Sequence, residues 1–263
     1  MFDGKTALAP IILLLLIAGW GCSGGLNRTA GVQDNFKIQN EVGAVKSIKV
    51  QDAEIEWLGH ATIRIVNDNK TIYVDPYNLE DASRKADLIL ITHGHYDHCS
   101  IGDIKKVARS GTIVIATSDC ISQLRKVENI SMKIVGPNRS IEIPNMPWLS
   151  IKTVPAYNIA KMFHSKENDW VGYIIEINGS RIYIAGDTDF IPEMKDIKGI
   201  EVAFLPVGGT YTMNAEEAAQ AANTMMPKVA VPIHYGTIVG SEKDAQKFKT
   251  LCRCNAEIME KVH

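Results

Sequence analysis

The feature that most constrains the fold is a histidine-rich segment placed directly between a buried strand and a helix. Leu88–Thr92 is a nearly continuous apolar run, the pattern of a strand that is buried on both faces. It leads into His93–His98 (HGHYDH), after which Ser100 and Asp103 predict a capped helix start. Imidazoles and carboxylates are ligands suited to zinc or another borderline divalent metal. The segment therefore predicts a metal centre at the end of a strand.

One turn of chain cannot wrap four donors around a single ion, so the segment favours two neighbouring ions. We expect His93 and His95 to face one ion, and Asp97 and His98 to face a second ion about 3.5–4 Å away. Zn²⁺ is the expected metal, with Mn²⁺ or Fe²⁺ as alternatives. A surface histidine cluster without a ligand fits poorly with a position between a buried strand and a capped helix.

Two further ligands are expected at the ends of other strands. The predicted strand 181–185 ends shortly before Asp187, and the strand 229–233 ends directly before His234. A carboxylate with two oxygens can bridge both ions, which is the role expected of Asp187, while His234 would complete the second ion's shell. Taken alone, Asp187 would be a turn former and His234 a hydrogen-bonding residue at a strand end.

Strand-like runs outnumber helical patterns from Ser47 onward. The predicted strands lie at 54–58, 61–66, 71–75, 88–92, 112–116, 132–135, 139–143, 149–154, 171–177, 181–185, 202–205 and 229–233. The predicted helices lie at 100–111, 118–127, 214–225 and 242–251. Both halves run strands and then helix, and two sheets packed face to face with helices outside would bury these elements. The predicted fold class is an α/β, four-layer αββα sandwich in one domain.

These motifs resemble those of the metallo-β-lactamase-fold superfamily, whose signature Thr-His-x-His-x-Asp-His is met here from Thr92 to His98. Asp75, the Gly-Asp-Thr step at Asp187 and the late His234 follow in the family's order. The segments WLGHAT (57–62), VDP (74–76) and LPVGGT (205–210) resemble one branch of it. That branch holds ascorbate-6-phosphate lactonase-like proteins, uncharacterised metal-dependent hydrolases and the N-acyl phosphatidylethanolamine phospholipase D type. The resemblance covers roughly residues 50–240 and implies the metallo-β-lactamase fold.

The chain departs from that branch at one position. Branch members usually place a metal-binding histidine where this chain has Asn158, whose neutral amide oxygen is a poor zinc ligand. His164 lies six residues further on, and we expect it to reach back as the third ligand of the first ion. The alternative is a loop histidine beside a two-histidine site. His60 lines the cleft or is a core or turn histidine, and His263 has no expected role.

The predicted function is that of a metal-dependent hydrolase. Two ions lower the pKa of a bridging water from ~15.7 toward ~7, and the hydroxide would attack a carbonyl carbon or a phosphorus atom. Asp97 would orient this nucleophile and shuttle its proton. Because the atom attacked is a carbonyl carbon or a phosphorus, the expected substrate is an ester, a lactone or a phosphodiester. Tyr235, Thr210 and Asn158 are candidate donors to the oxyanion. The alternative is a surface-anchored metal-binding or partner-binding module that has lost catalysis, for which Asn158 is the only support.

The amino terminus predicts export. The apolar run 7–20 would span about 21 Å as a helix, short of the ~30 Å hydrocarbon core, and fits the core of a signal peptide. Cys22 then follows as in a prokaryotic lipoprotein signal, so residues 1–22 are expected to form the signal and 23–46 a flexible tether before the hydrolase domain 47–263. We expect a membrane-anchored lipoprotein on the extracytoplasmic face; an uncleaved anchor is the alternative.

The net charge of the chain limits the classes of partner that we expect. The chain has 28 Lys and Arg residues and 30 Asp and Glu residues, which gives a net charge of −2 and therefore no excess of basic residues. A protein that coats nucleic acid is therefore not expected. The expected partner is a small-molecule substrate, with the membrane contacted only through the N-terminal anchor.

Overall fold

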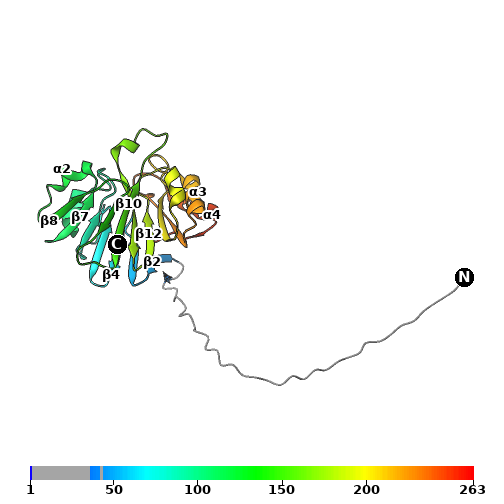
Figure 1. Ribbon diagram of the computed structural model, residues 1–263, viewed down its shortest axis with the longest axis horizontal. Coiled ribbons are helices and arrows are strands. Elements are labelled where there is room, and N and C mark those ends of the chain that lie inside the picture. The colour runs from blue at the N-terminus through cyan, green and yellow to red at the C-terminus, as the bar shows by residue number, and fades with distance from the viewer. Residues whose placement is uncertain (2–35, 42–43) are drawn as a thin grey trace, which may run out of the picture. The chain divides into compact units, whose positions relative to one another are not determined.

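The computed structural model describes Met1, residues 36–41 and residues 44–263. From Phe36 onward, the described chain forms two mixed sheets packed face to face with helices on their outer faces (Figure 1). This is the predicted four-layer sandwich.

The first sheet has eight strands, and their order in space follows the chain. They are β1 (Phe36–Glu41), β2 (Ala44–Val50), β3 (Ala53–Trp57), β4 (Ile63–Asn67), β5 (Lys70–Val74), β6 (Leu88–Leu90), β7 (Thr112–Ala116) and β8 (Ile130–Ile134). Strands β1 to β5 form an antiparallel meander. Strands β5 to β8 are parallel to one another.

The second sheet has seven strands, again in chain order. They are β9 (Ser140–Glu142), β10 (Leu149–Pro155), β11 (Val171–Ile177), β12 (Ser180–Ile184), β13 (Ile200–Pro206), β14 (Val229–Ile233) and the short β15 (Asn255–Ala256). Strands β9 to β12 are antiparallel and β12 to β15 are parallel. Each half of the chain therefore runs an antiparallel meander into parallel strands.

The helices cover the outer faces of the two sheets. The first sheet is covered by α1 (Ile101–Val107), the 3₁₀ turn η1 (Ser118–Cys120) and α2 (Ile121–Leu124), and the second by α3 (Ala215–Met225) and α4 (Glu242–Leu251). Two further 3₁₀ turns are η2 (Lys166–Asn168) and η3 (Pro192–Asp196). In Figure 1, α2 lies on one side of the sheets and α3 and α4 on the other.

Capping explains where two of these helices begin and end. The Ser100 hydroxyl accepts from the Asp103 N–H, as predicted, and Asn214 forms a full capping box at the start of α3. Helix α1 ends at Val107, four residues before the predicted stop, because the Thr112 hydroxyl accepts the Arg109 N–H.

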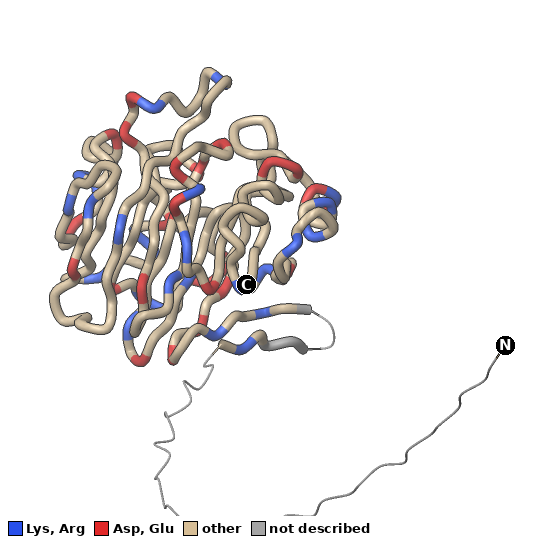
Figure 2. Tube along the Cα trace, turned by 45° about the vertical axis from the view of Figure 1, so that its right-hand side comes forward, with Lys and Arg blue, Asp and Glu red and all other residues tan. Residues whose placement is uncertain are grey.

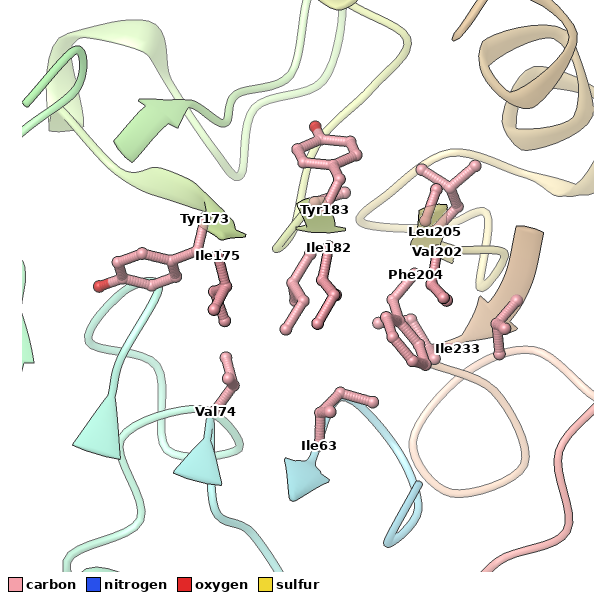
Figure 3. Close-up of a cluster of buried hydrophobic side chains, with 14 of the residues drawn as sticks. Ile63, Val74, Tyr173, Ile175, Ile182, Tyr183, Val202, Phe204, Leu205 and Ile233 are labelled. Atoms are coloured by element: carbon pink, nitrogen blue, oxygen red, sulfur yellow. The ribbon is translucent and has the colours of Figure 1, made fainter. Parts of the chain in front are cut away.

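The main core lies between the sheets, as Figure 3 shows. Ile63 and Val74 of the first sheet point toward Ile175, Ile182 and Phe204 of the second, and all five side chains are fully buried. Neighbouring residues of a strand point to opposite faces, so apolar residues at alternate positions supply this layer. The core holds the two sheets at a set distance and thereby positions the loops at their edges.

The folded chain begins earlier than the sequence predicted. β1 and the start of β2 lie within residues 23–46, which the sequence assigned to a tether. Phe36 and Ile38 pack partly against the core and Val45 is buried, so this segment joins the sheet as its edge. One short alternation of apolar residues in a polar stretch was too weak a signal to show this.

The predicted signal segment lies outside the described residues apart from Met1. Among the residues that the structure describes, no helix is long and apolar enough to span a membrane.

The strand directions bring the functional loops to one edge of each sheet. β3 and β5 both pair antiparallel with β4 and so run the same way, and β6 is parallel to β5. In the second sheet β10 and β12 run the same way for the same reason, and β13 and β14 follow β12. The two edges meet, since the His234 N–H donates to the His60 carbonyl and the Val171 N–H to the Thr92 carbonyl.

Candidate metal centre

The histidine-rich loop begins at His93, three positions after the end of β6. His93, Asp97 and His98 are buried and His95 is exposed. Gly94 lets the loop turn against its neighbour: its N–H donates to the Asp119 carboxylate at 2.8 Å, and a Cβ at this position would lie 2.6 Å from the same oxygen. A larger residue at this position would have to displace the Asp119 side chain.

A first group of imidazoles comes from this loop and from the loop after β10. His93, His95 and His164 offer nitrogen atoms that all lie within 4.8 Å of one another. The Trp170 ring packs against all three, with its centroid 4.6 Å from that of His93. No pattern in the sequence singled out Trp170, which forms an apolar wall behind this group.

The structure places His164, not Asn158, beside His93 and His95. The Nδ1 atom of His164 lies 3.0 Å from the Asn158 side-chain oxygen and 2.8 Å from the Tyr211 carbonyl oxygen. Because a carbonyl can only accept, Nδ1 carries the proton and Nε2 is left free to bind a metal. Asn158 is therefore not a member of the first group itself. Its side-chain oxygen helps to orient His164, which is.

A second group lies beside the first. Asp97, His98 and His234, together with His60, offer atoms within 4.8 Å of one another. The Nδ1 atom of His98 lies 2.7 Å from the Asp75 carboxylate, which turns Nε2 of His98 toward the group. The sequence singled out Asp75 only by its place in the family's order.

Asp187 lies between the two groups, with one oxygen toward each. Oδ2 lies 3.6 Å from Nε2 of His164 and 4.0 Å from Nε2 of His93. Oδ1 lies 3.1 Å from Nε2 of His234 and 3.3 Å from Nε2 of His98. This is the placement expected of a carboxylate that bridges two ions.

The donor atoms fit a metal better than they fit one another. Nε2 of His98, Nε2 of His234 and Oδ1 of Asp187 are buried. Both Nε2 atoms lie 3.1–3.3 Å from Oδ1, yet none of the three atoms has a hydrogen bond of good geometry to another described residue. A buried polar atom without a partner costs about 1–3 kcal/mol, and a cation between these three would satisfy all of them. Imidazole nitrogens and carboxylate oxygens are also the ligand types that zinc accepts.

Burial and charge set the protonation of the group when no metal is bound. Burial, aided by the neighbouring His98, holds the pKa of His93 well below its usual value. Burial alone would raise the pKa of Asp187, but the imidazoles of His234 and His98 outweigh it and lower that pKa strongly. Burial would lower the pKa of His98, yet Asp187 and Asp75 raise it well above its usual value. Without a metal, the two carboxylates therefore favour the protonated ring of His98.

His60 is buried beside the second group and contacts Asp97. Its Nε2 lies 2.9 Å from Oδ2 of Asp97. Burial lowers the pKa of His60 to about 4, so the ring is neutral and donates its Nε2 proton. Burial would raise the pKa of Asp97, but this hydrogen bond and the charge of His98 lower it to about 2. His263 lies on the surface beside Glu80.

A cavity of about 230 Å³ opens over both groups. Its lining residues are His95, Tyr96, Asp97, Phe163, His164, Asp187, Tyr211 and Ile238. None of the three expected oxyanion donors is among these residues. Tyr235 is buried with its ring stacked on Trp57, Asn158 is bonded to His164, and Thr210 is exposed.

Comparisons with known proteins show which family and which solved structures this chain resembles. The family model described as a β-lactamase superfamily domain matches residues 54–234. A UPF0173 metal-dependent hydrolase of Geobacillus thermodenitrificans is 35% identical over 217 residues, which cover 75% of this chain and 92% of that protein. A crystal structure described as a metal-dependent hydrolase of Parabacteroides distasonis has a TM-score of 0.72 and 32% identity, covering 86% of this chain and 100% of that one. A metallo hydrolase of Ignicoccus hospitalis has a TM-score of 0.66 and 26% identity, covering 80% of this chain and 96% of that one.

Proposed function

Since the chain belongs to the metallo-β-lactamase-fold superfamily and is a metal-dependent hydrolase, we propose that it works with two divalent ions, zinc in the first instance. The observation that carries the dinuclear assignment is the position of Asp187, whose two oxygens face separate groups of imidazoles. The first ion would be held by His93, His95 and His164, and the second by Asp97, His98 and His234, with Asp187 between them.

The reaction would be the hydrolysis of an ester, a lactone or a phosphodiester. The ions, when bound, supply a water of lowered pKa and an electrophilic contact for the scissile group. Asp97 lines the cavity, and its hydrogen bond from His60 holds one carboxylate oxygen in place. The carboxylate of Asp97 would then contact the second ion and orient the attacking water, whose proton it would take.

The alternative of a non-catalytic binding module rested on Asn158 alone. Asn158 does not replace a ligand here, because its side-chain oxygen faces Nδ1 of His164 and His164 itself enters the first group. With Asp97 and Asp187 both buried at the site, no feature of the described chain favours a loss of catalysis.

A small molecule is the proposed substrate. The cavity of about 230 Å³ suits a compact group. Figure 2 shows Lys and Arg interspersed with Asp and Glu along the trace of the described chain. The net charge of −2 gives no excess of basic residues for binding nucleic acid, so a small molecule is the better candidate.

The test combines metal analysis with a substrate screen. We expect elemental analysis of the purified protein to find close to two divalent ions per chain. We expect the zinc-, manganese- or iron-loaded protein to hydrolyse at least one member of a panel of esters, lactones and phosphodiesters. His93→Ala, which removes one ligand of the first ion, is the control for contaminating hydrolases. A protein that binds no metal under any loading condition would refute the proposal.

A further inference from the structure

Building on the proposed hydrolase function, we infer that the site takes substrates with an apolar chain next to the scissile group, and that Phe163 and Ile238 hold this chain. The inference rests on the side chains around the mouth of the cavity, which come from several separate loops.

The loop that carries Phe163 is closed by a hydrogen bond between its ends and held by further bonds in its middle. The Asn158 N–H donates to the His164 carbonyl at 2.6 Å, which closes the loop between these residues. In the middle of the loop, the Lys161 ammonium group binds the Asp189 carboxylate and donates to the Thr212 carbonyl at 2.6 Å. The side chains on the loop are therefore presented in a set direction.

Apolar and aromatic side chains line much of the cavity. Phe163 is 50% exposed and lines the cavity, with its ring edge-to-face on Tyr211 at a centroid distance of 4.7 Å. Ile238, from the loop after β14, is 36% exposed, and Tyr96, from the histidine-rich loop, is 65% exposed. Exposed apolar groups at a cavity favour an apolar ligand, because covering them removes apolar surface from water and lowers the free energy of the complex.

The charges at the mouth favour a neutral chain over a second anionic group. Among the described residues that line the cavity there is no Lys or Arg. The nearby cation of the loop, Lys161, is already paired with Asp189. A phosphate or carboxylate remote from the scissile bond would find no cation at the mouth, whereas an alkyl or aryl chain would lie between Phe163 and Ile238.

Alkyl hydroxamates test this inference without knowledge of the bond that is cleaved. The hydroxamate group chelates the metal, and the tail length varies from acetohydroxamate through butyrohydroxamate to octanohydroxamate. We expect calorimetry with the zinc-loaded protein to show that Kd falls about two- to fourfold for each added methylene of the tail. The lower value corresponds to a partly buried methylene and the higher value to a fully buried one. Phe163→Ser and Ile238→Ser should each reduce this dependence on chain length.

Met162→Ser is the matched control, because Met162 neighbours Phe163 and is 97% exposed but does not line the cavity. It should leave the dependence on chain length unchanged. Equal binding of all three hydroxamates would overturn the inference and leave the hydrolase function standing, and so would an equal loss with Met162→Ser. Failure of all three to bind would count against the metal centre, and the inference would fall with it.

Discussion

Replacing Asn158 with alanine should weaken the first metal site without removing a ligand. The side-chain oxygen of Asn158 lies 3.0 Å from Nδ1 of His164 and so helps to hold the ring whose Nε2 faces His93 and His95. Losing an orienting partner of a metal-bound histidine typically lowers metal affinity 10–100-fold. Asn158→Ala is therefore expected to raise the zinc Kd of the first site while the Kd of the second site stays the same.

The structure places the effect at the lower end of this range. Nδ1 of His164 has a second acceptor, the Tyr211 carbonyl at 2.8 Å, so the tautomer survives the substitution. We expect a loss of about tenfold, or ~1.4 kcal/mol. The Asn158 amide also donates to Asp189 and Tyr211, both at 3.0 Å. At about 1 kcal/mol for each bond, the metal-free protein should lose roughly 2–3 kcal/mol of its free energy of unfolding.

Two further variants separate orientation from stability. Asn214→Ala makes the same change at the N-cap of α3, where the side chain accepts from the Glu217 N–H and belongs to neither ligand group. It should cost ~1 kcal/mol of stability with no change in zinc affinity. His164→Ala should weaken the first site more than Asn158→Ala does. If Asn158 acts through His164, the double variant should bind zinc no more weakly than His164→Ala alone.

The assay is a titration of the metal-free protein with zinc in competition with a fluorescent chelator, fitted with two dissociation constants. Unchanged affinity in both Asn158→Ala and His164→Ala would return His164 to an ordinary loop histidine. A loss from Asn158→Ala that persists in full in the His164→Ala background would refute the orienting role.

Four other changes test separate parts of the structure. Asp75→Asn should lower the second-site zinc affinity 10–100-fold in the same titration, because it removes the carboxylate at 2.7 Å from His98; an unchanged value would contradict this role. Asp187→Asn should leave at most one tightly held ion by elemental analysis, and two would exclude a bridge. Ile182→Ala should cost about 2–5 kcal/mol in urea unfolding, since Ile182 is fully buried between the sheets, and a loss below ~1 kcal/mol would count against tight packing there. Cys22→Ser should release the protein from membranes, whereas continued membrane association would favour an uncleaved anchor.

The sequence predicted those parts of the fold and the site that depend on local pattern. The helix starts at Ser100 and Asn214 follow from capping residues three positions apart, and the structure confirms both. The strands before Asp187 and His234 were recognisable as short apolar runs, so their ends could be located. Local patterns were sufficient here because strand ends and caps involve residues that are near neighbours in the chain.

What the sequence could not predict depends on residues that are distant in the chain. His60 and Asp97 are 37 positions apart and their hydrogen bond requires two loops to meet, so His60 remained either a cleft residue or a core residue. Trp170 packs against the first group from a position with no ligand chemistry of its own. The acceptor for Nδ1 of His164 includes a backbone carbonyl, at Tyr211, and any residue type offers one.

Strand direction explains why the expected ligands come together although they are scattered along the chain. In each sheet the last three antiparallel strands, β3 to β5 and β10 to β12, return the chain to the same direction before the parallel strands begin. The first and last of these three strands therefore end at the same edge as every parallel strand that follows. His60, Asp75 and the histidine-rich loop leave the first sheet at that edge, and Asp187 and His234 leave the second. The order of the strands thus determines which residues meet, and the loop lengths determine which of them lie close enough to share an ion. This is why His164, six residues beyond Asn158, can lie beside His93 and His95 from a loop.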